Sequence, residues 1–313
     1  MTNIEEICII VFETTFKGNE SIKGVQMNKY LIVTDSSCDL PVDLAKELGV
    51  KILKLEFIVE GEEARQNDEI DEKQFYEILR SGKMITTSAV AMDKFISEVE
   101  PFVAEGFDVL YLGFSSGLSS TYSAGFVGAQ ELFEKYPDRK IYTVDTLAAS
   151  MGQGLLVWYA ANMQKEGKSI EEVRDFIEDN KMKLAHWFTV SDLFFLKRGG
   201  RISAATALVG TMLSIKPVMH VDDEGKLIKV ATARGRKNSI DALFAKVKET
   251  AIDPANQTMF ISHGDCIEDA EYLANKLKDE LSVKEVIISY VGPVIGAHSG
   301  PGTLAMFFIG TNR

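Results

Sequence analysis

Short apolar segments alternate with amphipathic ones from Lys29 to about residue 185. Four segments have the length and apolar content of buried strands: residues 30–35, 50–59, 109–114 and 140–145. The other segments have the spacing or the end signals of helices: residues 40–49, 71–82, 92–105, 119–136, 147–165 and 169–184. Strands that alternate with helices predict βαβ units and a mainly parallel sheet.

The second half of the chain has a different pattern. Residues 215–221 and 226–233 are strand-like and are joined by Asp-Asp-Glu-Gly, which indicates an antiparallel hairpin. Two more strands are expected at residues 257–263 and 284–291, separated by a helix. We therefore predict an α/β protein with a parallel-sheet domain over residues 28–185 and a smaller α+β domain over residues 186–313. Residues 1–27 are predicted to be an N-terminal extension outside the fold, with a small added strand as the alternative.

Composition and charge narrow the class of protein. The chain has 313 residues, which is typical of about two domains. Its net charge of −12 argues against a general nucleic-acid binder, because phosphate neutralisation needs clustered Lys and Arg. Three cysteines without a CxxC pair indicate a reduced, cytoplasmic setting with neither a disulfide framework nor a zinc site. No apolar run reaches the roughly 18 residues of a membrane span, so no stable membrane insertion is expected.

Two clusters of hydroxyl side chains precede predicted helices. The first is Thr86-Thr87-Ser88, and the second comprises Ser115, Ser116, Ser119, Ser120 and Thr121. Unsatisfied backbone N–H groups at a helix start favour an anion, either carboxylate or phosphate. If both clusters follow strands of one parallel sheet, they meet at its carboxyl edge and could hold one carboxylate. Helix capping is the alternative, although capping accounts for only one residue per helix.

The second cluster also contains Gly113-Phe114-Ser115-Ser116-Gly117, which matches the G-x-S-x-G nucleophile elbow of α/β hydrolases. Ser115, Asp265 and His298 have the chain order of such a triad. No HGGG-type segment that would supply the oxyanion hole lies upstream. A serine hydrolase of acyl substrates is therefore the alternative function.

Histidines and basic residues supply further candidates. His186 and His220 lie in apolar strands and are interpreted as structural. His263 follows a strand and His298 lies in a Gly/Pro-rich loop, and both are places where functional residues are common. Their spacing predicts no metal site. Two basic segments with glycines, residues 196–201 and 234–237, suggest contact with a phosphate or an acidic partner, with solvated surface charge as the alternative.

These segments, in this order, resemble the DegV family of fatty-acid-binding proteins. The resemblance rests on five motifs: Thr87-Ser88 (T-S-x-P-S), residues 115–122 (S-S-G-L-S-G-T-Y), residues 145–154 (D-[ST]-x-x-x-S-x-G-x-G), residues 196–202 (L-K-[KR]-G-G-R-I) and residues 292–302 (G-P-V-I-G-x-H-[ST]-G-P-G). The tripeptide Ile215-Lys216-Pro217 matches a further I-K-P motif. In this chain Ala89-Val90-Ala91-Met92 replaces the Pro and second Ser of the first motif, and Ser120 replaces a Gly of the second.

The resemblance implies a long-chain fatty acid bound between two domains, with no cofactor and no catalysis by the chain itself. It implies that Thr87 and Ser119 hold the carboxylate, with Ser88 and Ser116 as near candidates and His298 completing the site. It further implies a partner, an ATP-dependent fatty acid kinase, which converts the bound acid to an acyl phosphate for phospholipid synthesis.

The remaining expectations concern the kinase contact and the acyl chain. Arg201, Arg234 and Lys237 are the candidates for contact with the phosphate or the kinase. Apolar residues could line the channel or be plain core: Leu193, Phe194, Phe195, Met212 and Leu213.

Overall fold

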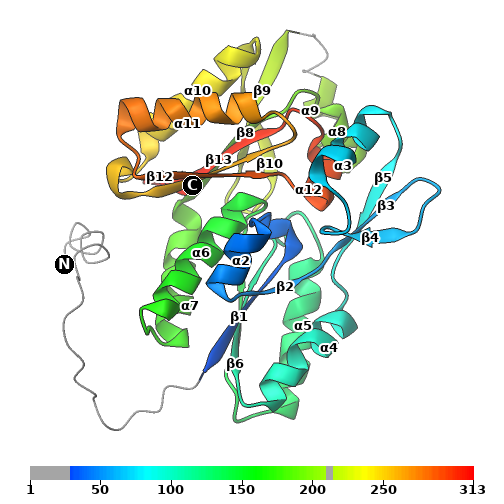
Figure 1. Cartoon of the computed structure of the whole chain (residues 1–313), viewed down its shortest axis with the longest axis vertical. Coiled ribbons are helices and arrows are strands. Elements are labelled where there is room, and N and C mark those ends of the chain that lie inside the picture. The colour runs from blue at the N-terminus through cyan, green and yellow to red at the C-terminus, as the bar shows by residue number, and fades with distance from the viewer. Residues whose placement is uncertain (1–28, 209–213) are drawn as a thin grey trace.

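The computed structural model describes residues 29–208 and 214–313, which form two large sheets and a small one (Figure 1). The predicted extension, residues 1–27, lies outside the described residues, as do Met212 and Leu213. The first sheet is parallel, with strand order β2-β1-β6-β7. Its strands are β1 (Tyr30–Asp35), β2 (Lys51–Leu53), β6 (Asp108–Gly113) and β7 (Ile141–Asp145).

The small sheet is antiparallel, with strand order β4-β3-β5. Its strands are β3 (Glu56–Val59), β4 (Ala64–Gln66) and β5 (Ile85–Ser88). The single strand predicted over residues 50–59 is therefore wrong, because it is divided between two sheets. Leu55 N donates to Ser36 Oγ at 2.9 Å instead of continuing the parallel ladder. The sequence does not reveal this division, because Leu53, Leu55 and Phe57 are buried at every second position on both sides of it.

The second large sheet has six strands in the order β10-β9-β8-β13-β11-β12. Only β11 and β12 pair in parallel, and the hairpin predicted from the acidic turn is confirmed as β9 and β10. The strands are β8 (Leu184–Thr189), β9 (Ile215–Val221), β10 (Leu227–Arg234), β11 (Thr258–His263), β12 (Glu285–Tyr290) and β13 (Leu304–Ile309). A parallel sheet followed by a mixed one confirms the predicted fold class. The predicted domain boundary at residue 185 falls inside β8, and the division into domains stays a prediction.

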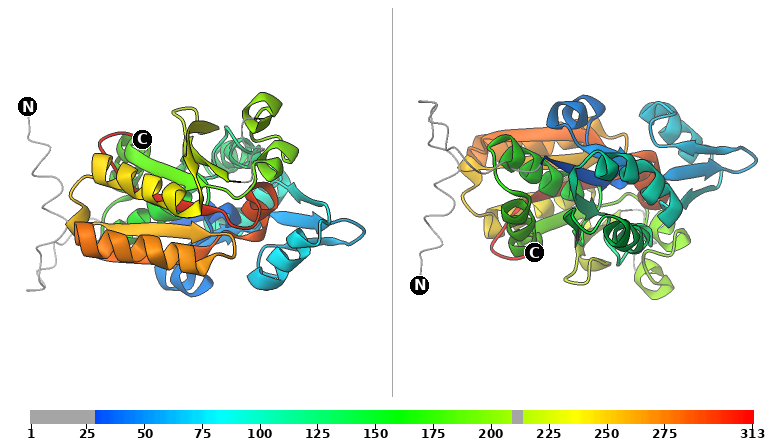
Figure 2. Two further views of the ribbon diagram at one scale, coloured as in Figure 1. Left: turned by 90° about the horizontal axis from the view of Figure 1, so that it is seen from above. Right: turned by 90° about the horizontal axis from the view of Figure 1, so that it is seen from below.

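Helices cover both large sheets, and one helix joins them. α4 and α5 pack on one side of the parallel sheet, and α10 and α11 cover the outer face of the six-stranded sheet (Figures 1 and 2). The bounds of the helices are α2 (Val42–Leu48), α3 (Glu72–Arg80), α4 (Met92–Ala104), α5 (Thr121–Lys135), α6 (Met151–Lys165), α7 (Ile170–Asn180), α8 (Phe194–Arg198), α9 (Ala204–Leu208), α10 (Arg236–Thr250), α11 (Ile267–Leu281) and α12 (Pro293–Ser299), with 3-10 turns at Ser36–Cys38, Lys181–Lys183 and Pro254–Asn256.

The joining helix, α6, contacts β1 and β6 on one side and β11 and β13 on the other. Leu155 and Leu156 are fully buried and belong to one apolar cluster that also includes Leu112 of β6 and Phe307 of β13. This shared core fixes the two sheets relative to each other, and the space at the N-terminal end of α6 becomes the cavity described next.

Candidate functional site

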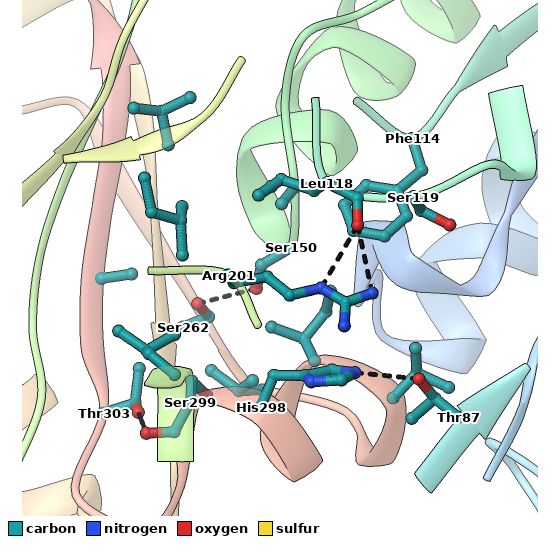
Figure 3. Close-up of a pocket in the computed structure, with 18 of the residues that line it drawn as sticks. Thr87, Phe114, Leu118, Ser119, Ser150, Arg201, Ser262, His298, Ser299 and Thr303 are labelled. Carbon is teal, nitrogen blue, oxygen red and sulfur yellow. Dashed lines mark hydrogen bonds between the residues drawn. The ribbon is translucent and has the colours of Figure 1, made fainter. Parts of the chain in front are cut away.

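A cavity of about 230 Å³ lies between the two large sheets, at the N-terminal end of α6 (Figure 3). Its lining comes from β5, from the turn between β6 and α5, from α12 and from the inner face of β8, β11 and β13. Most of the lining is apolar, and the polar residues gather in a few places. Thr87, Ser88, Ser119, Arg201 and His298 all line this one cavity.

Thr87 and His298 form a direct contact across the cavity, although they are 211 residues apart in the chain. Thr87 Oγ1 lies 2.8 Å from His298 Nε2 (Figure 3). Thr87 is held in β5, where it pairs with Phe57 of β3, and His298 is in the last turn of the short helix α12. Two residues predicted from separate motifs are therefore side by side.

Only one of the two hydroxyl clusters follows a strand of the parallel sheet, contrary to the expectation for both. Thr86-Thr87-Ser88 belongs to β5 of the small antiparallel sheet, whereas the second cluster follows the parallel strand β6. The residue at the N-cap position of α4 is Ala91, which makes no side-chain capping bond, so the first cluster does not serve as a cap there. The two clusters reach the same cavity from different sheets.

Ser119 lies in the turn between β6 and α5 and faces the same cavity. Its hydroxyl accepts a hydrogen bond from Thr121 N at 3.2 Å and lies 2.9 Å from Thr121 Oγ1. Asp35 anchors the start of this turn, because its buried carboxylate accepts a hydrogen bond from Phe114 N at 2.9 Å. The strand end, the turn and the helix start thus hold Ser119 in a fixed place without using all of its hydrogen-bonding capacity.

Arg201 places a half-buried cation beside these groups. Its guanidinium donates from Nε and Nη2 to the carbonyl of Leu118, at 3.3 and 3.2 Å, and from Nη1 to the carbonyl of Gly199. Burial lowers the pKa of this guanidinium from its ordinary value. None of the ion pairs in the described part of the chain includes Arg201. A desolvated cation without a carboxylate partner favours an anion in the cavity.

His298 is held in its neutral form. Burial, followed by the positive charges of Arg201 and Arg198, lowers the pKa of His298 from 6.5 to about 4. The ring packs directly against Gly199, where an added Cβ would lie 2.1 Å from Nδ1. A neutral imidazole can donate one hydrogen bond and accept one. The site therefore offers hydroxyls, an imidazole and a guanidinium beside apolar walls, a combination that suits a carboxylate with an apolar tail.

Comparison with known proteins identifies the family. A family model described as "Uncharacterised protein, DegV family" matches residues 29–311. A DegV domain-containing protein of Clostridium perfringens is 47% identical over 289 residues, which cover 92% of this chain and 99% of that protein. The chain belongs to the DegV family.

Solved DegV structures share the fold. A structure described as fatty acid binding of a DegV family protein from Thermus thermophilus has a TM-score of 0.80 and 31% identity, and the match covers 89% of this chain and 98% of that one. DegV of Bacillus subtilis, described as a fatty acid binding protein, has a TM-score of 0.77 and 27% identity, covering 90% and 99% of the two chains. The α/β architecture predicted from the DegV resemblance is confirmed.

Three of the predicted site residues lie away from the cavity of this DegV protein. Ser116 is exposed, and its N–H donates to Asp145 Oδ1 at 3.2 Å. Arg234, at the end of β10, and Lys237, in the first turn of α10, are also exposed, and the Lys237 ammonium lies 5.6 Å from the ring centre of Tyr272. These two basic residues do not join Arg201 at the cavity.

The triad of the alternative hydrolase function is not assembled. Ser115 is fully buried, and its hydroxyl donates to the carbonyl of Gly225 at 2.8 Å. Asp265 pairs with Arg80, and the Nε2 atom of His298 faces Thr87. Ser115 therefore has neither the exposure nor the base that nucleophilic catalysis requires.

The structure decides between cavity lining and plain core for the apolar candidates that it describes. Leu193 belongs to the apolar core and Phe194 is 54% exposed, and neither they nor Phe195 line the cavity, whereas Leu196 does. His186, interpreted as structural, is buried in β8 but also lines the cavity. Ser150 and Ser262 line it too. Ser150 is the serine of the motif over residues 145–154, for which no ligand role is predicted from the sequence, and Ser262 lies in none of the motifs.

Among the described residues, none of the helices combines the length and the apolar character needed to cross a bilayer.

Proposed function

We propose that this DegV protein binds a long-chain fatty acid, with the carboxylate at Thr87, Ser119 and His298 and the tail between the two large sheets. The observation that carries the proposal is the Thr87–His298 contact of 2.8 Å, made by distant segments on the wall of one mainly apolar cavity. The fatty-acid-binding relatives from Thermus thermophilus and Bacillus subtilis support the same class of ligand.

The charge of the ligand fits the polar groups. An ionised carboxylate can accept about four hydrogen bonds, and burying it requires most of them to be made. The hydroxyls of Thr87 and Ser119 and the imidazole of His298 can donate, and Arg201 supplies a compensating positive charge on the same cavity wall. Ser88 lies next to Thr87 on that wall and is a further donor.

The apolar part of the cavity supplies most of the binding free energy. Each buried CH₂ group contributes about 0.8 kcal/mol, so a sixteen-carbon tail contributes on the order of 10 kcal/mol before the cost of ordering the chain. Phe114, Leu118 and Leu196 line the cavity near the carboxylate groups, and Phe188 and Phe307 line it on the six-stranded sheet. The hydroxyls then determine mainly which end of the fatty acid lies at Thr87 and Ser119, and the apolar lining contributes most of the affinity.

The proposal includes presentation of the bound acid to an ATP-dependent fatty acid kinase. Ala89 and Ser120, which line the cavity near Thr87 and Ser119, are exposed, whereas Ser262 and Phe307 on the opposite wall are buried. The polar end of the cavity is therefore the end nearer to solvent, where a second enzyme could transfer phosphate to the carboxylate. The acyl phosphate would then enter phospholipid synthesis, and the chain itself would act as a binding protein.

Native mass spectrometry of the purified protein tests the ligand. We expect the protein to carry one co-purified long-chain fatty acid, which is released on denaturation and identified by its mass. A protein that carries no lipid and does not take up added stearic acid would contradict the proposal. Labelling of Ser115 by a fluorophosphonate, in the same preparation, would favour the hydrolase alternative.

A coupled assay with a purified fatty acid kinase and ATP tests presentation. Charge reversal of Arg234 and Lys237 together should slow acyl phosphate formation and leave the Kd for the fatty acid unchanged, because both side chains lie outside the cavity. An unchanged rate of phosphorylation would remove these two residues from the kinase contact. If the wild-type protein supports no phosphorylation at all by kinases that act on its relatives, presentation itself is contradicted.

A further inference from the structure

The cavity wall carries polar groups that the carboxylate does not need. Ser150 precedes α6, Ser262 is in β11 and His186 is in β8, and all three line the cavity. They are buried, with 5%, 0% and 2% of their surface exposed. In Figure 3 the Ser150–Ser262 pair lies to the left of the Arg201 guanidinium, whereas Thr87 and Ser119 lie to its right. This second polar group is therefore separate from the proposed carboxylate site.

Ser150 links Ser262 to a buried acid. Ser150 Oγ lies 2.5 Å from Asp39 Oδ2 and 3.0 Å from Ser262 Oγ. A serine hydroxyl has one proton, so Ser150 can donate to only one of these neighbours. If it donates to Asp39, Ser262 donates to Ser150 and keeps its lone pairs free. If a protonated Asp39 donates to Ser150, Ser150 donates to Ser262, whose proton is then free.

Asp39 is able to take either form near neutral pH, because burial raises its pKa to about 8. In both forms Ser262 keeps hydrogen-bonding capacity that the protein does not use. A group that can both donate and accept, such as an alcohol, matches Ser262 in either state, whereas a carbonyl matches only one of them.

His186 is the third buried polar residue on this part of the cavity wall. Burial lowers its pKa well below 6.5, so its imidazole is neutral. Its Nδ1 atom lies 3.2 Å from the carbonyl of Leu184, which makes Nδ1 the donor and leaves Nε2 as an acceptor. Nε2 is buried and has no hydrogen-bond partner among the described residues. Nε2 lies against Gly152 of α6, where an added Cβ would lie 2.2 Å away, so recognition of a ligand hydroxyl falls to Ser262 and Ser150.

We propose that the fatty acid preferred by this protein carries a hydroxyl group along its chain, recognised by Ser262 and Ser150. This inference rests on the proposed function, because it assumes that the acyl chain occupies the cavity. In a wholly apolar channel a chain hydroxyl would lose its bonds to water and weaken binding by roughly tenfold or more. Here the wall offers partners, while a saturated chain leaves them unsatisfied.

The test compares stearic acid with a series of stearic acids that carry one hydroxyl at successive carbons, and with the keto acids of the same positions. Delipidated wild-type protein is titrated with each acid by isothermal calorimetry. We expect one hydroxy isomer to bind at least as tightly as stearic acid and about fivefold more tightly than its keto counterpart, as one net hydrogen bond predicts.

Two variants test whether Ser262 causes the preference for the hydroxy acid over the keto acid. Ser262→Ala should abolish the advantage of that isomer over its keto counterpart. Thr189→Val is the matched control, because Thr189 is fully buried with an unpartnered hydroxyl but does not line the cavity. It should leave the advantage unchanged.

The outcomes separate this inference from the proposed function. If stearic acid binds and every hydroxy isomer binds more weakly, the polar groups are satisfied by water and the inference is wrong. It is also wrong if the preference survives Ser262→Ala. If none of the acids binds, the proposed function fails, and this inference fails with it.

Discussion

The neutral state of His298 makes the stability of the protein sensitive to acid in a defined pH range. The pKa of His298 is about 4 in the folded protein, compared with about 6.5 in an unfolded chain. A folded-state pKa below the unfolded one gives stability that is present above pH 6.5 and is lost as the pH falls toward 4. Linkage between these two pKa values predicts a loss of about 2 kcal/mol from this one group between pH 7 and pH 5.

The variant His298→Gln isolates this contribution. Glutamine keeps a hydrogen-bonding side chain and does not titrate, so the free energy of unfolding of the variant should fall by about 2 kcal/mol less than that of the wild type between pH 7 and pH 5. The measurement is urea denaturation of delipidated protein at the two pH values. Other buried histidines, including His186 and His263, contribute equally to both proteins and cancel in the comparison. Equal losses in the variant and the wild type would refute the idea that Arg201, Arg198 and burial hold His298 neutral.

Three further predictions concern the carboxylate site. Thr87→Val removes one hydroxyl at nearly constant volume. It should weaken stearic acid binding by about tenfold to a hundredfold, because a hydrogen bond to a charged group is lost. The control Ser116→Ala, at an exposed residue, should leave the Kd measured by calorimetry unchanged. Equal Kd values for the two variants would count against Thr87 as a ligand. Gly199→Ala should weaken binding and lower the Tm, because the new Cβ would lie 2.1 Å from His298 Nδ1; an unchanged Tm would show that the ring has room to move. Arg201→Gln should weaken binding of stearic acid more than that of stearyl alcohol, and an equal effect on both would mean that the guanidinium does not face the carboxylate.

Much of the fold could be predicted from the alternation of strands and helices, because buried parallel strands and amphipathic helices have distinct periods. The parallel sheet and the β9–β10 hairpin appear where their patterns indicate. Three strands, β4, β5 and β13, were not predicted. The segment over residues 50–59 was predicted wrongly, because one apolar alternation runs through two strands of different sheets. Periodicity reports which side chains are buried, and it does not report which neighbour supplies the hydrogen bonds.

The candidate site was predictable only in part. The two hydroxyl clusters already placed Thr87 and Ser119 at one carboxylate site, but on the wrong premise that both follow strands of one parallel sheet, since β5 belongs to a different sheet from β6. The resemblance to a family added His298. Ser116 lies in the same serine-rich turn as Ser119 and yet is exposed to solvent. The direction of a side chain in an irregular turn depends on backbone geometry that a motif does not specify.

The pairing of Ser150 with Ser262 was not predictable, although Ser150 lies in the motif over residues 145–154, because the pairing depends on tertiary contacts. They come from the start of α6 and from β11, are 112 residues apart, and meet only through the packing of α6 between the two large sheets. The polarity of this part of the cavity wall is thus a property of the fold, and local sequence patterns do not reveal it.

A crystal structure of the protein with a bound long-chain fatty acid tests the central claim most directly. We expect carboxylate oxygens within about 3 Å of Thr87 Oγ1 and Ser119 Oγ, with the tail running between the parallel and the six-stranded sheets. A carboxylate at Ser150 and Ser262, with the tail directed toward Thr87, or a fatty acid outside this cavity, would contradict the claim.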